Sequence, residues 1–246
     1  MAGPGECAAA SGDRSRFYAS LREAGRRVAV LAEASGGGRQ RESRPPDPGE
    51  DFDAVFDVGF VPQEEPRPLP RTPYGFVPDG PTEEERAHTS SSPIPDVAER
   101  TIPWVAVGLQ TPTNASLAAE LVEALDPGGF VSMPDPTMSV REPRSLPDLR
   151  ELSGVLGRTG YYVWGSDGPH YESHCFVRAI LNGAVPCRVG GGPEQTGGIP
   201  GSFESVSALR VAVDERGFDS MYGAAREFYL SRGTLGEHLE NALESV

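Results

Sequence analysis

The sequence has 246 residues, of which 36 are acidic and 22 basic, so its formal net charge is −14. All of the basic side chains are arginines, because the sequence contains no lysine. Nucleic acids and anionic membranes bind clustered basic residues. Because this acidic chain has no basic blocks, we do not expect it to bind nucleic acid. No apolar run approaches the roughly 20 residues of a transmembrane helix, and we therefore expect no membrane span.

The three cysteines, Cys7, Cys175 and Cys187, are too few and odd in number for a disulfide framework. Residues 1–13 have neither the charged start nor the long apolar core of a secretory signal. We therefore expect a cytoplasmic protein.

The first hundred residues, 1–100, are predicted to form a partly irregular N-terminal region. A short helix is expected at 13–24 and strands at Val28–Ala32 and 52–60, where apolar residues follow the spacing of these elements. Residues 61–100 contain nine prolines, which interrupt helices and strands, so this stretch is predicted to be a linker. Within the linker we expect a short helix that is capped by Thr82.

The remaining residues, 101–246, are predicted to form a second domain in which strands and helices alternate. Apolar runs predict the strands, and apolar residues that recur on one helical face predict the helices between them. The expected strands lie at 102–108, 129–133, 161–165 and 184–189, and the expected helices at 114–125, 147–156 and 170–182. Two further helices are expected, one bearing Met221, Ala225 and Phe228 and one starting at a capping box of Thr234 and Glu237.

Strands that alternate with helices at this spacing require right-handed crossovers and a parallel sheet. The predicted fold is therefore α/β, with a Rossmann-like parallel sheet of about four strands and C-terminal helices that brace it. The N-terminal region before the sheet is expected to be irregular and rich in proline. Ligands of such sheets bind beyond the carboxyl ends of the strands, where loops lead into helices.

The loop after the first strand of this sheet offers groups that bind phosphate. Gly108, Thr111 and Thr113 lie between that strand and the next helix, where backbone N–H groups and hydroxyls can hold an anion. The alternative is purely structural, because Thr113 or Asn114 can cap the helix. The sequence leaves both interpretations open.

Residues 164–175 hold the densest group of polar side chains. Ser166 and Asp167 are expected either to line a ligand site at a helix N-terminus or to face solvent. His170 and His174 are four residues apart and share a helical face beside Cys175, an arrangement that is compatible with zinc. No second pair of ligands has the spacing of a zinc site, so no metal site is predicted.

Several common motifs are missing from the sequence. No Gly-x-Gly-x-x-Gly fingerprint follows a predicted strand, and a phosphate-binding loop of the Gly-x-x-x-x-Gly-Lys type is excluded because there is no lysine. No Gly-x-Ser-x-Gly elbow for a nucleophilic serine is present. These absences argue against a dinucleotide-binding enzyme, a P-loop protein and a serine hydrolase.

The segment HYESHCFVRAILNGAVPCRVGG, which begins at His170, resembles the second nucleotide-binding half of GT-B glycosyltransferases. Within that group it is most similar to the group-1 and spore-maturation-type enzymes, in which an alanine-rich helix is followed by Gly-Ala-Val-Pro. The run IPWVAVG resembles the first strand of that half, and FYLSRGTLGEHLENAL resembles its closing helices. The resemblance covers roughly residues 101–245.

The resemblance implies a protein that transfers a sugar from a nucleotide-sugar donor to an unknown acceptor, with no other cofactor and no divalent metal. Arg178 stands where the family has its ribose-binding glutamate, so Glu172, earlier on the same helix, is the expected acidic partner of the ribose. His170 is the expected catalytic base, because its ordinary pKa lies nearest neutrality. The expected site comprises His170 and Glu172 as catalytic residues and Gly108, Thr111, Thr113, Ser166, Asp167 and Arg178 as donor-binding residues.

The alternative function is that of a non-catalytic pseudo-glycosyltransferase. Such a protein would keep the fold and act as an interaction module. Its acidic, proline-rich N-terminal region would then bind a protein partner.

Overall fold

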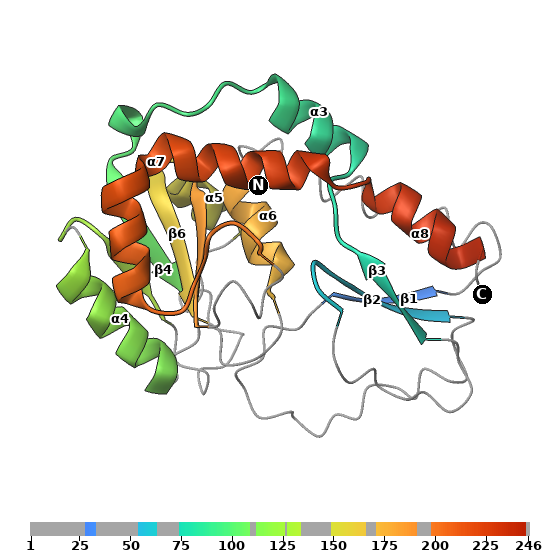
Figure 1. Cartoon of the computed structure of the whole chain (residues 1–246), viewed down its shortest axis with the longest axis horizontal. Coiled ribbons are helices and arrows are strands. Elements are labelled where there is room, and N and C mark those ends of the chain that lie inside the picture. The colour runs from blue at the N-terminus through green and yellow to red at the C-terminus, as the bar shows by residue number, and fades with distance from the viewer. Residues whose placement is uncertain are drawn as a thin grey trace.

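The computed structural model describes residues 28–32, 54–62, 74–108, 112–125, 127–133, 149–165, 171–190 and 198–244. In these residues the chain forms two parallel β-sheets with helices packed around them (Figure 1). The helix expected at 13–24 lies outside the described residues. No helix among the described residues is long and apolar enough to span a membrane.

The larger sheet confirms the predicted α/β fold with a Rossmann-like parallel sheet. Its strands pair in the order β5-β4-β6-β7-β8, and every pair is parallel. The bounds are β4 Ile102–Val107, β5 Phe130–Ser132, β6 Thr159–Gly165, β7 Val185–Val189 and β8 Ser202–Phe203. The sequence predicted about four strands, and β8 adds a fifth.

The fifth strand escaped prediction because it is two residues long and follows a glycine-rich loop. It pairs with β7 through Arg188 and Val189. Gly201, just before β8, has a φ of +82°, and a Cβ at this position would lie 2.0 Å from the backbone oxygen of Pro186. Only glycine allows the chain to approach β7 this closely.

The helices after β4 lie close to the predicted ranges, except that α7 begins well before the predicted stretch that bears Met221, Ala225 and Phe228. The bounds are α4 Pro112–Ala124, α5 Leu149–Leu156, α6 Ser173–Leu181, α7 Val206–Ser231 and α8 Leu235–Glu244. After α6 the backbone turns at Gly183, whose φ of +72° suits glycine. The predicted capping box before α8 is confirmed, because Thr234 and Glu237 exchange both backbone–side-chain hydrogen bonds.

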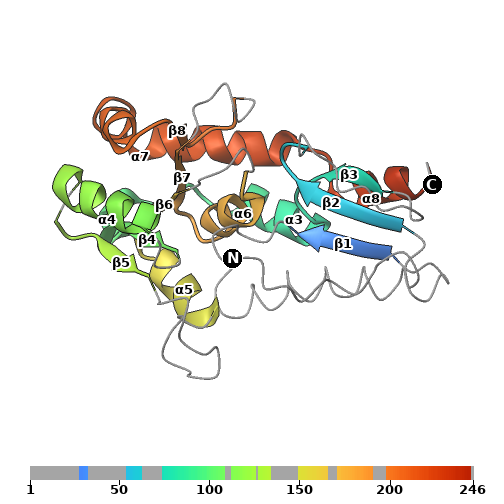
Figure 2. The same ribbon diagram turned by 90° about the horizontal axis from the view of Figure 1, so that it is seen from below.

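The helices cover the two faces of the larger sheet (Figure 2). Successive side chains of a strand point to opposite faces. Tyr161 of β6 contacts Phe218 of α7, whereas the neighbouring Tyr162 contacts Cys175 of α6. Helices α4 and α7, which pack on each other, therefore lie on one face, and α6 lies on the other.

A second, smaller sheet corrects the prediction of a linker over 61–100. It consists of β1 Val28–Ala32, β2 Ala54–Gly59 and β3 Tyr74–Pro78, in the order β1-β2-β3 and all parallel. The sequence predicted β1 and β2, but the prolines around β3 hid its short apolar run. The expected helix capped by Thr82 is confirmed as α3, Glu83–Ser91, and a 3-10 turn follows at Val97–Glu99.

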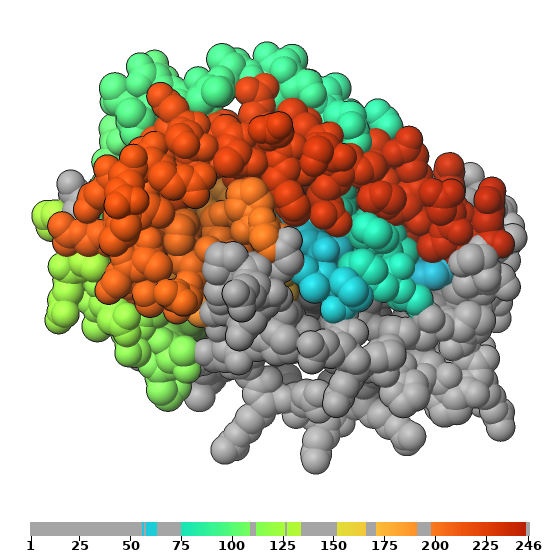
Figure 3. All heavy atoms as spheres, viewed as in Figure 1, coloured from blue at the N-terminus to red at the C-terminus, as the bar shows by residue number. Residues whose placement is uncertain are grey.

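The C-terminal helices connect the two sheets. Helix α7 packs on β7 of the larger sheet, changes direction at Gly217, whose φ is 70°, and is followed by α8, which packs on β3. Apolar side chains of α8 and the smaller sheet form a separate small core of Phe56, Val58, Val77, Leu235 and Leu239. Figure 3 shows α7 and α8 as a continuous band, with α3 along its upper side and part of the smaller sheet below it.

Arginine side chains bind the carbonyl ends of helices across the molecule. Arg226 of α7 donates hydrogen bonds to three carbonyls at the end of α3, and Arg86 of α3 donates to two carbonyls at the end of α7. Arg100 binds the ends of both α5 and α6, and Arg210 binds the end of α4. The accepting residues are Thr89, Ser90, Ser92, Leu230, Arg232, Leu156, Gly157, Asn182 and Ala124.

The planar guanidinium explains why these contacts use arginine. The last carbonyls of a helix lack intrahelical partners and carry partial negative charge. One guanidinium has five N–H donors in a fixed plane, whereas a lysine ammonium is a point charge on a flexible stem. The side chain of Arg226 reaches three carbonyl oxygens at 2.6 to 3.1 Å.

Replacement of Arg226 by lysine tests this explanation. Arg226→Lys keeps the charge but loses the planar set of N–H donors. We therefore expect the free energy of unfolding to fall by about 1–2 kcal/mol. The measurement is chemical denaturation followed by circular dichroism. The matched control, Arg216→Lys on the exposed side of the same helix, should change stability by no more than about 0.5 kcal/mol. Equal stability of the two variants would show that the charge alone holds α3 to α7.

Candidate functional site

The topology of the larger sheet identifies one end of it as the candidate site. The chain forms β4 inside the sheet, moves outward to the edge strand β5, and then returns past β4 to form β6, β7 and β8. Helix α4 after β4 and helix α6 after β6 lie on opposite faces, so the chain changes direction between these neighbouring strands. In open parallel sheets the ligand binds at this switch point, beyond the carboxyl ends of the strands.

At the switch point the side chain of Asn114 lies between the ends of two strands. Gly108 follows β4 and Gly165 ends β6. A Cβ at Gly108 would lie 2.9 Å from Asn114 Nδ2, and a Cβ at Gly165 would lie 3.0 Å from Asn114 Oδ1. Both glycines therefore make room for this amide, which belongs to the first turn of α4.

The predicted donor-binding residues of this loop are only partly described. Gly108 lies at the switch point, and Thr113 is exposed in the first turn of α4. Thr111 lies outside the described residues. The sequence presented Asn114 as an alternative cap of the helix, whereas its side chain lies against the strand ends.

Glu172 is held at the start of α6 by two residues of the sheet. Its Oε2 accepts a hydrogen bond from Trp164 Nε1 at 3.1 Å and another from Arg188 Nε at 3.3 Å. Trp164 and Arg188 are paired neighbours on β6 and β7, so their side chains lie on the same face. Although Glu172 is the N-cap residue of α6, its side chain makes no capping hydrogen bond, because the carboxylate is turned toward the sheet.

Arg188 is a second arginine near this site, beside the predicted Arg178. Its side chain is only 1% exposed, donates to the backbone oxygen of Gly190, and lies over the ring of Tyr171 at 5.6 Å from the centroid. Burial raises the pKa of Tyr171 well above its ordinary value, so this hydroxyl stays neutral. The sequence missed Arg188 because it stands within an apolar strand.

Arg178, His174 and Cys175 form a second group on α6. The Nε2 of His174 lies 3.3 Å from Cys175 Sγ, which also accepts a hydrogen bond from Tyr162 at 3.8 Å. Burial lowers the pKa of His174, and the nearby Arg178 guanidinium lowers it further. The neutral imidazole is therefore favoured in the folded protein.

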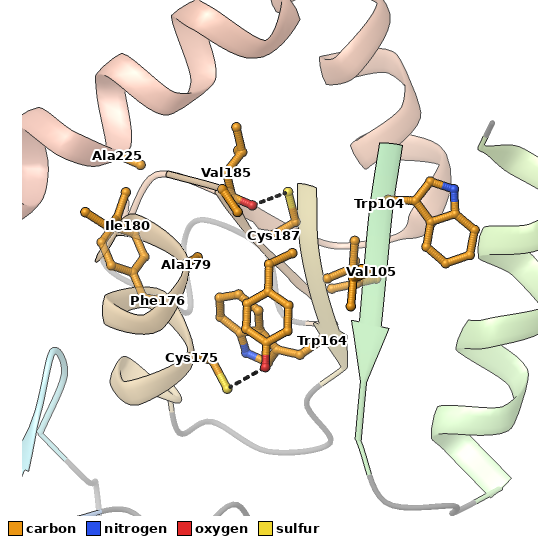
Figure 4. Packing of buried hydrophobic residues seen from close by; sticks show 14 of the residues in the cluster. Trp104, Val105, Trp164, Cys175, Phe176, Ala179, Ile180, Val185, Cys187 and Ala225 are labelled. Carbon is orange, nitrogen blue, oxygen red and sulfur yellow. Dashed lines mark hydrogen bonds between the residues drawn. The ribbon is translucent and has the colours of Figure 1, made fainter. Parts of the chain in front are cut away.

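The two described cysteines lie on different sides of the larger sheet. Cys187 pairs with Val163 on β6, on the face that α7 covers, whereas Cys175 of α6 contacts Tyr162 on the opposite face. Figure 4 shows Cys187 beside Val185 and Cys175 on α6. Among the described residues there is no group of three or more His, Cys, Asp and Glu side chains that could hold a metal ion.

The smaller sheet meets the same end of α6. Asp79 follows β3, and its Oδ2 accepts a hydrogen bond from Ser173 Oγ at 2.8 Å, with both residues buried. Arg232 Nε donates to the backbone oxygen of Asp79, and the same guanidinium lies 4.8 Å from the centre of the Phe60 ring. The candidate site therefore lies where the carboxyl ends of both sheets come together at α6.

The remaining predicted residues are not tested by the structure. His170, Ser166 and Asp167 lie outside the described residues, as does Thr111. The structure adds Asn114, Trp164 and Arg188 to the site. Trp164 had a usable signal in the sequence, because it is the last large residue before the polar segment that follows β6.

Comparison with known proteins adds no family. No protein-family model matches the sequence, and no curated protein matches it significantly.

The lowered pKa of His174 predicts a pH effect on stability. Below the ordinary value of 6.5 the unfolded chain binds a proton at this histidine more readily than the folded chain. The contribution of the neutral His174 to the free energy of unfolding is therefore complete above that pH and is lost as the pH falls. His174→Gln should lose less stability than the wild type between about pH 7.5 and about pH 5.5.

Denaturation of both proteins at each pH measures this difference. A wild type and a His174→Gln variant with parallel pH curves would show that burial does not exclude the proton from His174.

Proposed function

We propose that this protein binds a nucleotide-sugar and transfers the sugar to an acceptor, as a glycosyltransferase of the GT-B type. The observation that carries the proposal is the switch point between β4 and β6, with helices that start from it on opposite faces. That is where nucleotide-binding parallel sheets hold their ligand. The resemblance of the segments around β4, α6 and β7 to GT-B enzymes gives the ligand its class.

The proposed arrangement uses groups that suit each part of the donor. The diphosphate binds at the N-termini of α4 and α6, where N–H groups and the helix dipole favour an anion. Arg178 supplies a positive charge from α6. Glu172 accepts hydrogen bonds from the ribose, and His170 is the base that the sequence predicts.

In the proposed reaction an acceptor hydroxyl oxygen forms a bond to the anomeric carbon of the sugar. The bond from that carbon to the diphosphate oxygen breaks, and the nucleoside diphosphate leaves with the electron pair. The proton of the acceptor hydroxyl passes to the base. Groups that stabilise the negative charge on the leaving diphosphate lower the barrier of this step.

The acceptor is proposed to approach from the smaller sheet. Asp79 brings the carboxyl end of β3 to the N-terminus of α6, next to Glu172. A second sheet at this position gives the site a wall that the larger sheet alone does not provide. The Asp79–Ser173 hydrogen bond and the stacking of Arg232 on Phe60 fix that wall in place.

Nucleotide binding is the direct test of this function. Isothermal titration calorimetry with UDP and GDP should give saturable binding to the wild type without added metal. Arg178→Ala removes a charge-assisted contact to the diphosphate and should weaken binding about tenfold or more. Arg216→Ala, an exposed arginine on α7, is the matched control and should bind as the wild type does.

The opposite outcome favours the other function considered from the sequence. If the wild type binds no nucleoside diphosphate at millimolar concentration, the donor site does not exist and the enzyme proposal fails. The non-catalytic interaction module would then be the remaining interpretation. Binding that survives unchanged in Arg178→Ala would move the diphosphate away from α6.

A further inference from the structure

The ion pair of Glu172 and Arg188 is an unusual way to start a helix. A carboxylate at the first position of a helix ordinarily accepts from the free N–H groups there. Glu172 gives up that role, and its Oε2 instead accepts from Trp164 and Arg188. Two donors from neighbouring strands therefore fix the direction of this side chain.

Stability does not account for the pair. Arg188 is 1% exposed, and the removal of a charged pair from water costs free energy that its mutual attraction only partly returns. Apolar side chains of similar volume often give equal or greater stability at such positions. A buried charge that aims another residue, rather than stabilising the fold, is characteristic of functional sites.

One oxygen of the carboxylate remains for a ligand. The Glu172 side chain is 13% exposed, and among the described residues none donates to its Oε1. An ionised carboxylate is purely an acceptor and can take several hydrogen bonds. A fitting partner therefore presents hydroxyl donors, and the ribose of the proposed nucleotide carries two on adjacent carbons.

We propose that Trp164 and Arg188 are positioning residues that aim Oε1 of Glu172 at the ribose and so select ribonucleotides over 2′-deoxyribonucleotides. The inference rests on the proposed function, because it requires a nucleotide at the switch point. It goes further by naming the two residues that act through Glu172 and the sugar that they distinguish. Trp164 and Arg188 act from the sheet side, where no contact with the nucleotide is needed.

The test compares dissociation constants of UDP and 2′-deoxy-UDP, and of GDP and 2′-deoxy-GDP, by calorimetry. The wild type should bind the ribonucleotide about tenfold or more tightly than its deoxy form, as expected for a lost hydrogen bond to a charged group. Glu172→Gln should reduce that ratio strongly. Trp164→Phe keeps an aromatic ring, removes the N–H donor, and should lower the ratio several-fold.

Two further variants make the result specific. Trp104→Phe is the matched control, because Trp104 is buried in the same sheet and faces away from α6, and its ratio should equal that of the wild type. Arg188→Lys keeps the charge but changes the donor geometry and should lower the ratio as Trp164→Phe does. Should Trp164→Phe fail to fold, as judged by circular dichroism, Arg188→Lys decides the question.

The outcomes separate this inference from the proposed function. Nucleotide binding with equal affinity for the ribo and deoxy forms, or a ratio unchanged in Trp164→Phe and Arg188→Lys, overturns the positioning role and leaves the function standing. No nucleotide binding by the wild type overturns both. A ratio that falls in Trp164→Phe and Arg188→Lys but not in Trp104→Phe supports the inference.

Discussion

The hydrogen bonds of arginine to the carbonyl ends of helices are the interaction on which the arrangement of this protein depends. The ends of α3, α4, α5, α6 and α7 each accept from an arginine that belongs to another part of the chain. Arg226 and Arg86 connect α3 and α7 in both directions, and Arg100 binds α5 and α6 together. These carbonyls lack partners within their own helices, and only the guanidinium has enough donors in one plane to serve two helices at once. The exclusive use of arginine thus has a structural consequence in this chain.

The same contacts place the candidate site. Arg100 binds the C-terminal end of α6, Asp79 accepts a hydrogen bond from Ser173 in its first turn, and the carboxylate of Glu172 connects the start of the helix to the sheet through Arg188. Helix α7, tied to α3, runs from the larger sheet toward the smaller one and carries Phe228, whose ring contacts Phe60. The N-terminus of α6 therefore contacts both sheets in a fixed arrangement. A site built on helix and strand ends that are held in this way keeps its geometry better than one built on loops.

Much of the fold, but little of the site, could be predicted from the sequence. Apolar periodicity located β4, β6 and β7 and the helices between them, because the spacing of side chains in one element is a local property. It missed β3, where prolines surround a five-residue strand, and β8, which is too short to show a pattern. Among the site residues, Glu172 was predicted from the family resemblance, as the acidic residue on the helix that carries Arg178. Its partner Arg188 was not found, because a charged residue inside an apolar strand gives no sign of the face to which it points.

The sequence by itself determined most of the elements, their order along the chain, and the parallel character of the larger sheet. It also determined that every basic contact would be made by arginine. Only the tertiary structure decided that β6 pairs with β4, which creates the switch point, and that Trp164 and Arg188 pair side by side and converge on one oxygen of Glu172. The reason is that element formation depends on neighbours a few residues apart, whereas strand order and register depend on contacts between segments that are distant in sequence. The chemistry of the candidate site belongs to the second kind.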